Sequence, residues 1–76
     1  MSSSLDAYDR LRTALVDARH SANLTQLDVA SQLSRPQSFV SKYEQGERRL
    51  DVVEFLAVCR VLKADPHEIL RAIHDY

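Results

Sequence analysis

Four hydrogen-bonding side chains recur at helical spacing in the middle of this 76-residue chain. They are Gln37, Ser38, Ser41 and Lys42. Residues three and four apart lie on one face of an α-helix, so a helix here would present all four together. Glutamine pairs with adenine, lysine donates to guanine, and serine bonds to either, so the set predicts contacts with base edges in a major groove. A solvated helix face of the same composition is the alternative that these residues alone leave open.

Two helices joined by a tight turn, over residues 25–46, are predicted to position these side chains. Thr25 is a good N-cap, and Asp28 stands at the capping-box position. Pro36 can begin the second helix, because a first turn needs no N–H there. Gly46 can end that helix in a left-handed conformation.

Three further helices are expected around this pair. The first spans Leu5–His20, and Asn23 is suited to a left-handed turn after it. Asp51 caps another helix with Glu54 at the capping-box position, and Asp65-Pro66 begins the last. The sequence therefore predicts an all-α, compact bundle of about five helices that forms a single domain over residues 1–76.

The composition allows a small core and argues against several functions. With 45% apolar and 28% charged residues the chain can fold compactly, although its formal net charge of −1 is unusual for a DNA-binding protein. Cations do outnumber acids around the second central helix. The single Cys59 forms no internal disulfide, and no apolar stretch is long enough for a membrane span, so we expect a cytoplasmic protein. No histidine or cysteine spacing suits a metal, one glycine allows no glycine-rich phosphate loop, and nothing localises a Ser–His–Asp set. We therefore expect no enzyme, metal or cofactor.

The order of these motifs resembles a known family. The pieces are Leu24-Thr25-Gln26, Ala30, Gln37-Ser38 and the run from Val40 to Gly46. Together they are similar to the lambda-repressor/Cro-type helix-turn-helix, or xenobiotic-response-element (XRE), family of bacterial and phage transcriptional regulators. The resemblance covers roughly Tyr8 to Leu70. One departure is the turn, where the family usually has glycine and then an aliphatic residue, and this chain has Ser34-Arg35.

The resemblance implies a role for each candidate residue. Base edges would be contacted by Gln37, Ser38 and Lys42, with Ser41 a weaker candidate. Phosphates would be bound by Gln26, Arg48 and Arg49, with lesser contributions from Arg35 and Gln45. The family also implies a structural ion pair between Arg19 and Glu44. Phe39 is expected to pack beside Val40 and Tyr43, the alternative being contact with a thymine methyl.

Aliphatic residues on the helix after Asp51 form two stripes. The first, expected in the core, comprises Val52, Phe55, Leu56, Cys59 and Leu62. The second comprises Val53, Ala57 and Val61, and with Tyr76 it predicts a homodimer interface. Ile69, Leu70 and Ile73 are expected to face inward from the last helix.

We therefore expect a sequence-specific, double-stranded-DNA-binding transcriptional regulator that acts as a homodimer on a palindromic operator. Small restriction–modification controllers and phage repressors of the family are both organised in this way. The alternative is a protein-interaction module of the same fold, such as an antitoxin or a coactivator-like adaptor, that uses the last two helices as its partner surface.

Overall fold

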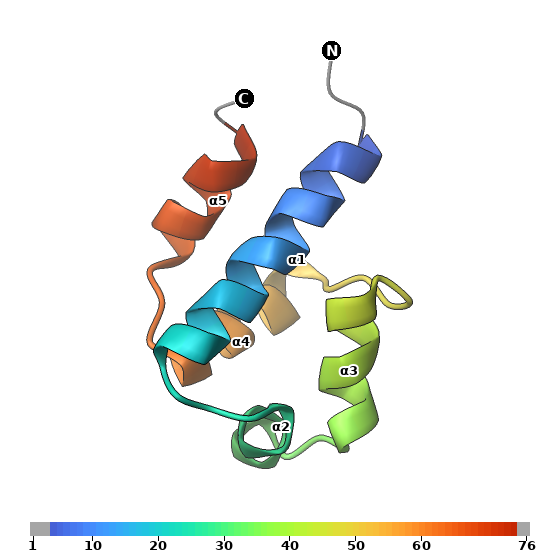
Figure 1. Cartoon of the computed structure of the whole chain (residues 1–76), viewed down its shortest axis with the longest axis vertical. Helices are drawn as coiled ribbons and strands as arrows, with labels where there is room; N and C mark the ends of the chain where they lie inside the picture. Colours follow the sequence, from blue (N-terminus) through green and yellow to red (C-terminus); the bar gives the residue numbers. More distant parts are fainter. Residues whose placement is uncertain (1–3, 75–76) are drawn as a thin grey trace.

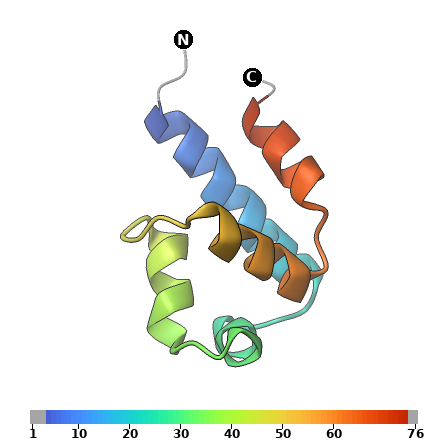
Figure 2. The same cartoon turned by 180° about the vertical axis from the view of Figure 1, so that it is seen from behind.

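The structure is a computed structural model that describes residues 4–74, and within this range it contains five α-helices and no strand. They are α1 (Ser4–Ser21), α2 (Gln26–Leu33), α3 (Gln37–Gln45), α4 (Val52–Leu62) and α5 (Pro66–His74). Helix α1 is central: α5 packs along one side of it and α3 lies on the other (Figure 1). Seen from behind, α4 crosses α1 and α2 closes the end of the bundle (Figure 2). The predicted all-α bundle is confirmed.

Local capping explains where two of these helices begin. The Thr25 hydroxyl accepts a hydrogen bond from the Asp28 N–H at 3.0 Å, and the Asp28 carboxylate accepts one from the Thr25 N–H at 2.9 Å. These bonds to Thr25 lower the pKa of Asp28. Asp51 and Glu54 form the same reciprocal pair at the start of α4, at 2.7 and 3.0 Å. Both predicted capping boxes are therefore confirmed.

Left-handed residues end the helices or shape the connections between them. Asn23 and Gly46 have φ values of 59° and 83°, as the sequence predicts, and Ser34 and Lys63 have φ values of 57° and 56°. The expected place of Pro36 is wrong by one residue. It is the N-cap before α3, in an extended conformation, and α3 begins at the next residue.

The core lies where α1, α2, α3 and α4 meet, and α5 adds one buried residue. Its members are Leu15, Val29, Ala30, Phe39, Val40, Tyr43, Phe55, Val58, Cys59, Leu62 and Ile69. The predicted core face of α4 is partly wrong, because Val52 and Leu56 are 73% and 43% exposed. Val58 is fully buried in their place. The buried arc of α4 is thus rotated toward Val58.

The second aliphatic stripe of α4, predicted as a dimer interface, is only partly exposed to solvent. Val53 is 77% exposed, whereas Ala57 is half-buried and Val61 packs against the core. Tyr76, the remaining residue of the predicted dimer interface, lies outside the described residues. In α5, Ile69 is buried as expected, but Leu70 is 49% exposed, because α5 has only α1 as its main packing partner and buries one face.

Candidate nucleic-acid interface

The outer face of α3 is an uninterrupted strip of polar side chains. It consists of Gln37, Ser38, Ser41, Lys42 and Gln45, four of them exposed and Ser41 half-buried. Each residue advances about 100° around a helix, so these five occupy a continuous arc of about 140°. All four predicted base-contacting residues therefore lie on one face. We call this face the polar strip.

The opposite side of α3 is buried and fixes how the helix is rotated. Phe39, Val40 and Tyr43 are at most 6% exposed, and the Phe39 and Tyr43 rings meet edge to face with centroids 5.6 Å apart. The packing expected for Phe39 is confirmed. Among the described residues the buried Tyr43 hydroxyl has no hydrogen-bond partner, and its burial, together with the nearby Glu44 charge, raises the pKa of Tyr43.

An ion pair ties α3 to α1. Arg19 Nε lies 2.7 Å from Glu44 Oε2, and Arg19 Nη2 lies 3.1 Å from Oε1. Both side chains are nearly buried, and the bond to Glu44 raises the pKa of Arg19. This confirms the structural pair. Gln26, a predicted phosphate-binding residue, donates its side-chain amide to Glu44 Oε1 at 2.8 Å and so extends the same network to α2.

A second arginine of α1, Arg12, also holds α3. Arg12 is half-buried, and its Nη1 donates to the Glu44 carbonyl at 3.2 Å, near the end of α3. A Cβ added to Gly46 would lie 3.2 Å from Arg12 Cζ, so glycine also leaves room for this contact. Arg12 and Arg19 are seven residues, or two helical turns, apart and so share a face of α1. This spacing is the sequence signal that could have indicated that Arg12 also faces α3.

The basic residues flanking α3 differ in their partners. Arg48 forms a two-bond pair with Glu54, at 2.9 and 2.7 Å. Arg35, in the turn before α3, lies 3.4 Å from the same carboxylate. Arg49 instead stacks over Tyr8, with its Cζ 4.5 Å from the ring centroid. Glu54 and Tyr8 therefore fix the side chains of these arginines. The sequence predicted only a capping role for Glu54 and no role for Tyr8.

The turn between α2 and α3 keeps the geometry that glycine usually provides. Ser34 is left-handed, with φ 57° and ψ 42°, and its N–H bonds back to carbonyls of α2. The Arg35 N–H also returns to the Ala30 carbonyl at 2.9 Å. Ser34 therefore adopts the left-handed conformation for which glycine is usually favoured, although the residue types here depart from the family pattern.

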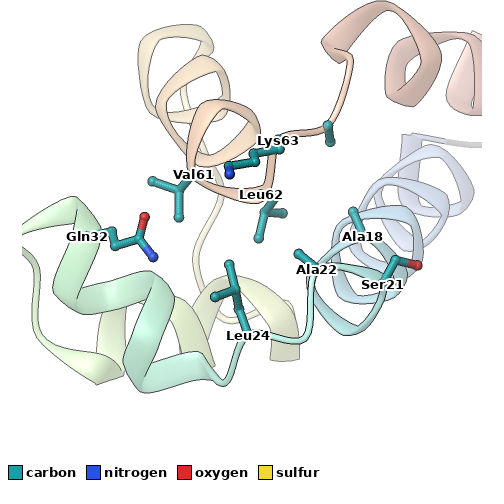
Figure 3. A pocket seen from close by; sticks show the side chains of 9 residues that line it. Ala18, Ser21, Ala22, Leu24, Gln32, Val61, Leu62 and Lys63 are labelled. Carbon is teal, nitrogen blue, oxygen red and sulfur yellow. The ribbon is translucent and has the colours of Figure 1, made fainter.

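Acidic, histidine and cysteine side chains and one hollow were also compared with what a metal or ligand site would need. Residues 4–74 contain no cluster of histidine, cysteine or acidic side chains that could hold a metal. Cys59 is buried, which raises the pKa of its thiol. An open hollow of about 530 Å³ lies between the end of α1, α2 and the end of α4 (Figure 3). Leu24, Gln32 and Val61 are among its lining residues, and none comes from α3.

No helix within the described residues has the length and apolar character needed to cross a membrane.

Comparisons with protein-family models and with solved structures agree with the helix-turn-helix arrangement of α2 and α3. A family model described as a helix-turn-helix domain matches residues 10–72. A solved structure, of an XRE-family like protein from Pseudomonas syringae pv. tomato str. DC3000, is similar to the chain at 47% identity and a TM-score of 0.85. The match covers 90% of this chain and 83% of that one. No curated protein sequence matches the chain. A helix-turn-helix fold of this kind is typical of regulators that are not enzymes. The chain belongs to the XRE-type helix-turn-helix family of DNA-binding regulators.

Proposed function

We propose that this protein binds duplex DNA sequence-specifically by placing α3 in the major groove, and that it regulates transcription as a homodimer on a palindromic site. The observation that carries the proposal is the polar strip, which presents Gln37, Ser38 and Lys42 on one exposed arc. The buried opposite face and the Arg19–Glu44 pair hold that arc in a fixed orientation. Fixed side chains are what discrimination between bases requires, because each well-placed contact contributes about 1–3 kcal/mol.

The distribution of charge supports DNA as the partner despite the net charge of −1. Glu44 is paired with Arg19 and its side chain is 6% exposed, so its negative charge is compensated within the protein. Among residues 4–74, Lys42 and Arg49 have no carboxylate partner. The DNA-facing side is therefore more positive than the overall composition indicates, which favours phosphate contacts and electrostatic attraction.

Phosphate contacts are proposed for residues around the strip. Arg49 lies exposed beyond the end of α3, and Gln45 is the last residue of that helix. Gln26 begins α2 and uses one of its two amide hydrogens on Glu44, which leaves the other for a phosphate. Such contacts fix the orientation of the protein on the duplex without selecting a sequence.

Selection of bound fragments from random duplexes tests the whole proposal. A palindromic consensus with half-sites about 34 Å apart is expected from a dimer of this type. On the selected duplex, Lys42→Ala should weaken binding by about 1–3 kcal/mol if it removes a base contact. Lys63→Ala is the matched control, because Lys63 is an exposed lysine at the far end of α4. Failure of the wild type to bind any duplex, or equal effects of the two changes, contradicts the proposal.

Exposed aliphatic residues at the start of α4 support self-association. Val52 and Val53 are 73% and 77% exposed and Leu56 is 43% exposed. Burying such side chains against a second copy would remove apolar surface from water. The same surface would also suit a different protein, which is the observation that favours the adaptor function as the second candidate. An adaptor would bind a partner protein, and its affinity for DNA would not depend on the base sequence.

A further inference from the structure

One carboxylate on α4 holds both arginines that flank α3. Glu54 accepts two bonds from Arg48, at 2.9 and 2.7 Å, and lies 3.4 Å from Arg35 Nη2. It also accepts the Asp51 N–H at 3.0 Å. The Glu54 side chain is 14% exposed, so this carboxylate is largely enclosed by the groups that bind it.

An aromatic ring restrains the same two arginines. The Cζ atom of Arg35 lies 4.6 Å from the Phe39 ring centroid, and that of Arg48 lies 4.8 Å from it. Arg35 precedes α3 and Arg48 follows it, so the two guanidinium groups converge from opposite ends of the helix. Phe39 is 6% exposed and buried in the core, which gives both arginines a fixed surface to stack on.

The pairing uses the atoms that a phosphate would need. A guanidinium binds carboxylate and phosphate through the same planar pair of N–H groups. In Arg48 that pair faces Glu54, and Nη1 also donates to the Arg49 carbonyl at 2.9 Å. Bonds from Arg48 and from the Asp51 N–H lower the pKa of Glu54 to about 2, so the carboxylate stays ionised near neutral pH.

We propose that Glu54 is a positioning residue that acts as an internal counter-ion, holding Arg48, and more weakly Arg35, away from the DNA backbone. It thereby sets how many phosphates the protein neutralises. The inference rests on the proposed DNA-binding function. It assigns phosphate contact to Arg49, which has no carboxylate partner in the described part of the chain, and withholds it from the adjacent Arg48.

The test measures how affinity for a duplex of random sequence depends on salt. Each neutralised phosphate contributes about 0.9 to the slope of log affinity against log salt concentration. In the wild-type background, Arg48→Ala should leave the slope unchanged. Glu54→Gln should steepen it by about 1 to 2, because one or both arginines are released. In the Glu54→Gln background, Arg48→Ala should then lower the slope by about 0.9.

The chain offers a matched control for the lost charge. Glutamine can keep the capping-box bond to the Asp51 N–H, so Glu54→Gln removes the charge while preserving the start of α4. Asp51→Asn removes one negative charge from the same helix start, and asparagine is an equally good N-cap. The Asp51 charge acts on Arg48 only through space, after the Glu54 bond, and Asp51 forms no hydrogen bond or ion pair with either arginine side chain. Asp51→Asn should therefore leave both arginines on Glu54 and the slope close to that of the wild type.

Two results overturn the inference and leave the proposed function intact. One is a flatter slope on Arg48→Ala alone, which would place Arg48 on a phosphate in the wild type. The other is an equal change of the salt slope on Glu54→Gln and on Asp51→Asn, which would show that the slope depends only on the net charge of the protein. The first comparison does not depend on whether Glu54→Gln folds. Absence of duplex binding by the wild type at every salt concentration overturns both the inference and the proposed function.

Discussion

Two adjacent arginines show how much a role depends on the partner of each side chain. Arg48 is paired with Glu54 through two bonds, whereas Arg49 stacks on the Tyr8 ring and is exposed. The two have the same charge and nearly the same place in the chain. Their capacity to bind a phosphate differs, because only one has its planar N–H pair occupied by a carboxylate.

Base and phosphate contacts should respond differently to mutation. Gln37→Ala is expected to relax the preference at one base position of each half-site, because a bidentate contact to adenine is lost. Arg49→Ala should weaken all sequences alike and flatten the salt slope by about 0.9. Competition binding with single-base variants of the selected duplex, at several salt concentrations, separates the two effects. A uniform loss on Gln37→Ala would contradict its assignment.

The Glu54 carboxylate should also couple stability to pH. Its pKa is lowered in the folded protein from the ordinary value of 4.5 to about 2. A lowered pKa means that the unfolded chain binds the proton more tightly, so this stabilisation is complete above about pH 4.5 and is lost as the pH falls toward 2. Urea unfolding should therefore show a difference between wild type and Glu54→Gln that shrinks over this range. A constant difference would show that the Glu54 charge is not involved.

At the scale of elements, side-chain caps and left-handed residues define much of where helices start and stop. Thr25 and Asp51 begin α2 and α4, and Gly46 ends α3. These contacts are local in sequence. They set the lengths of α2 and α3, and so they decide which residues of α3 can share the polar strip.

Ser34 occupies a conformation that suits glycine better. A left-handed conformation costs a non-glycine residue about 1–2 kcal/mol. Glycine removes this cost, but it also raises the conformational entropy of the unfolded chain, which offsets part of the gain. Ser34→Gly should therefore raise the free energy of unfolding by about 0.5–1 kcal/mol. Ser31→Gly, the same change at an exposed site inside α2, should lower it by a few tenths to about 1 kcal/mol. Chemical denaturation measures both, and destabilisation by Ser34→Gly would contradict this account of the turn.

The link between α1 and α3 is electrostatic as well as apolar. Arg19→Ala would leave Glu44 with a 6% exposed side chain and without its cation. A loss on the order of 3 kcal/mol in the free energy of unfolding is expected, since an unpaired buried charge is costly. Arg60→Ala, at an exposed position on α4, should change stability by less than about 0.5 kcal/mol. Equal effects would show that the Arg19–Glu44 pair does not stabilise the bundle.

At the scale of the whole molecule, α1 separates the proposed DNA-binding face from α5. Helix α3 lies on one side of α1 and α5 on the other (Figures 1 and 2). Exposed aliphatic residues lie on both α4 and α5, with Val53 77% and Leu70 49% exposed. Both helices therefore offer apolar surface on which a second copy could dock.

The proposed homodimer is tested by charge insertion at these two positions. Val53→Glu should convert a dimer to a monomer in sedimentation equilibrium, because a carboxylate would be buried in the apolar contact. Leu70→Glu is the matched control on α5 and should leave the dimer intact. Dissociation by Leu70→Glu alone would place the interface on α5, and a wild-type monomer at all concentrations would contradict the homodimer.

The sequence predicted the helices well because their ends depend on near neighbours. The caps at Thr25 and Asp51 and the left-handed Gly46 were all foreseen from residue type and spacing. The core of α4 was predicted less well. Val52, Leu56 and Val58 are all aliphatic, and only the way that α4 packs on the other helices selects Val58 for burial.

The sequence by itself determined the five helices, the family resemblance, and the polar face of α3, because helical periodicity and capping act over three or four residues. Beyond the Arg19–Glu44 pair, which the family resemblance implied, only the tertiary structure decided which charges meet. Glu54 binds Arg48 and Arg35, and Arg12 reaches α3, across contacts that join separate elements. Ion pairing depends on distances of a few ångströms between side chains, and spacing along the chain does not fix those distances.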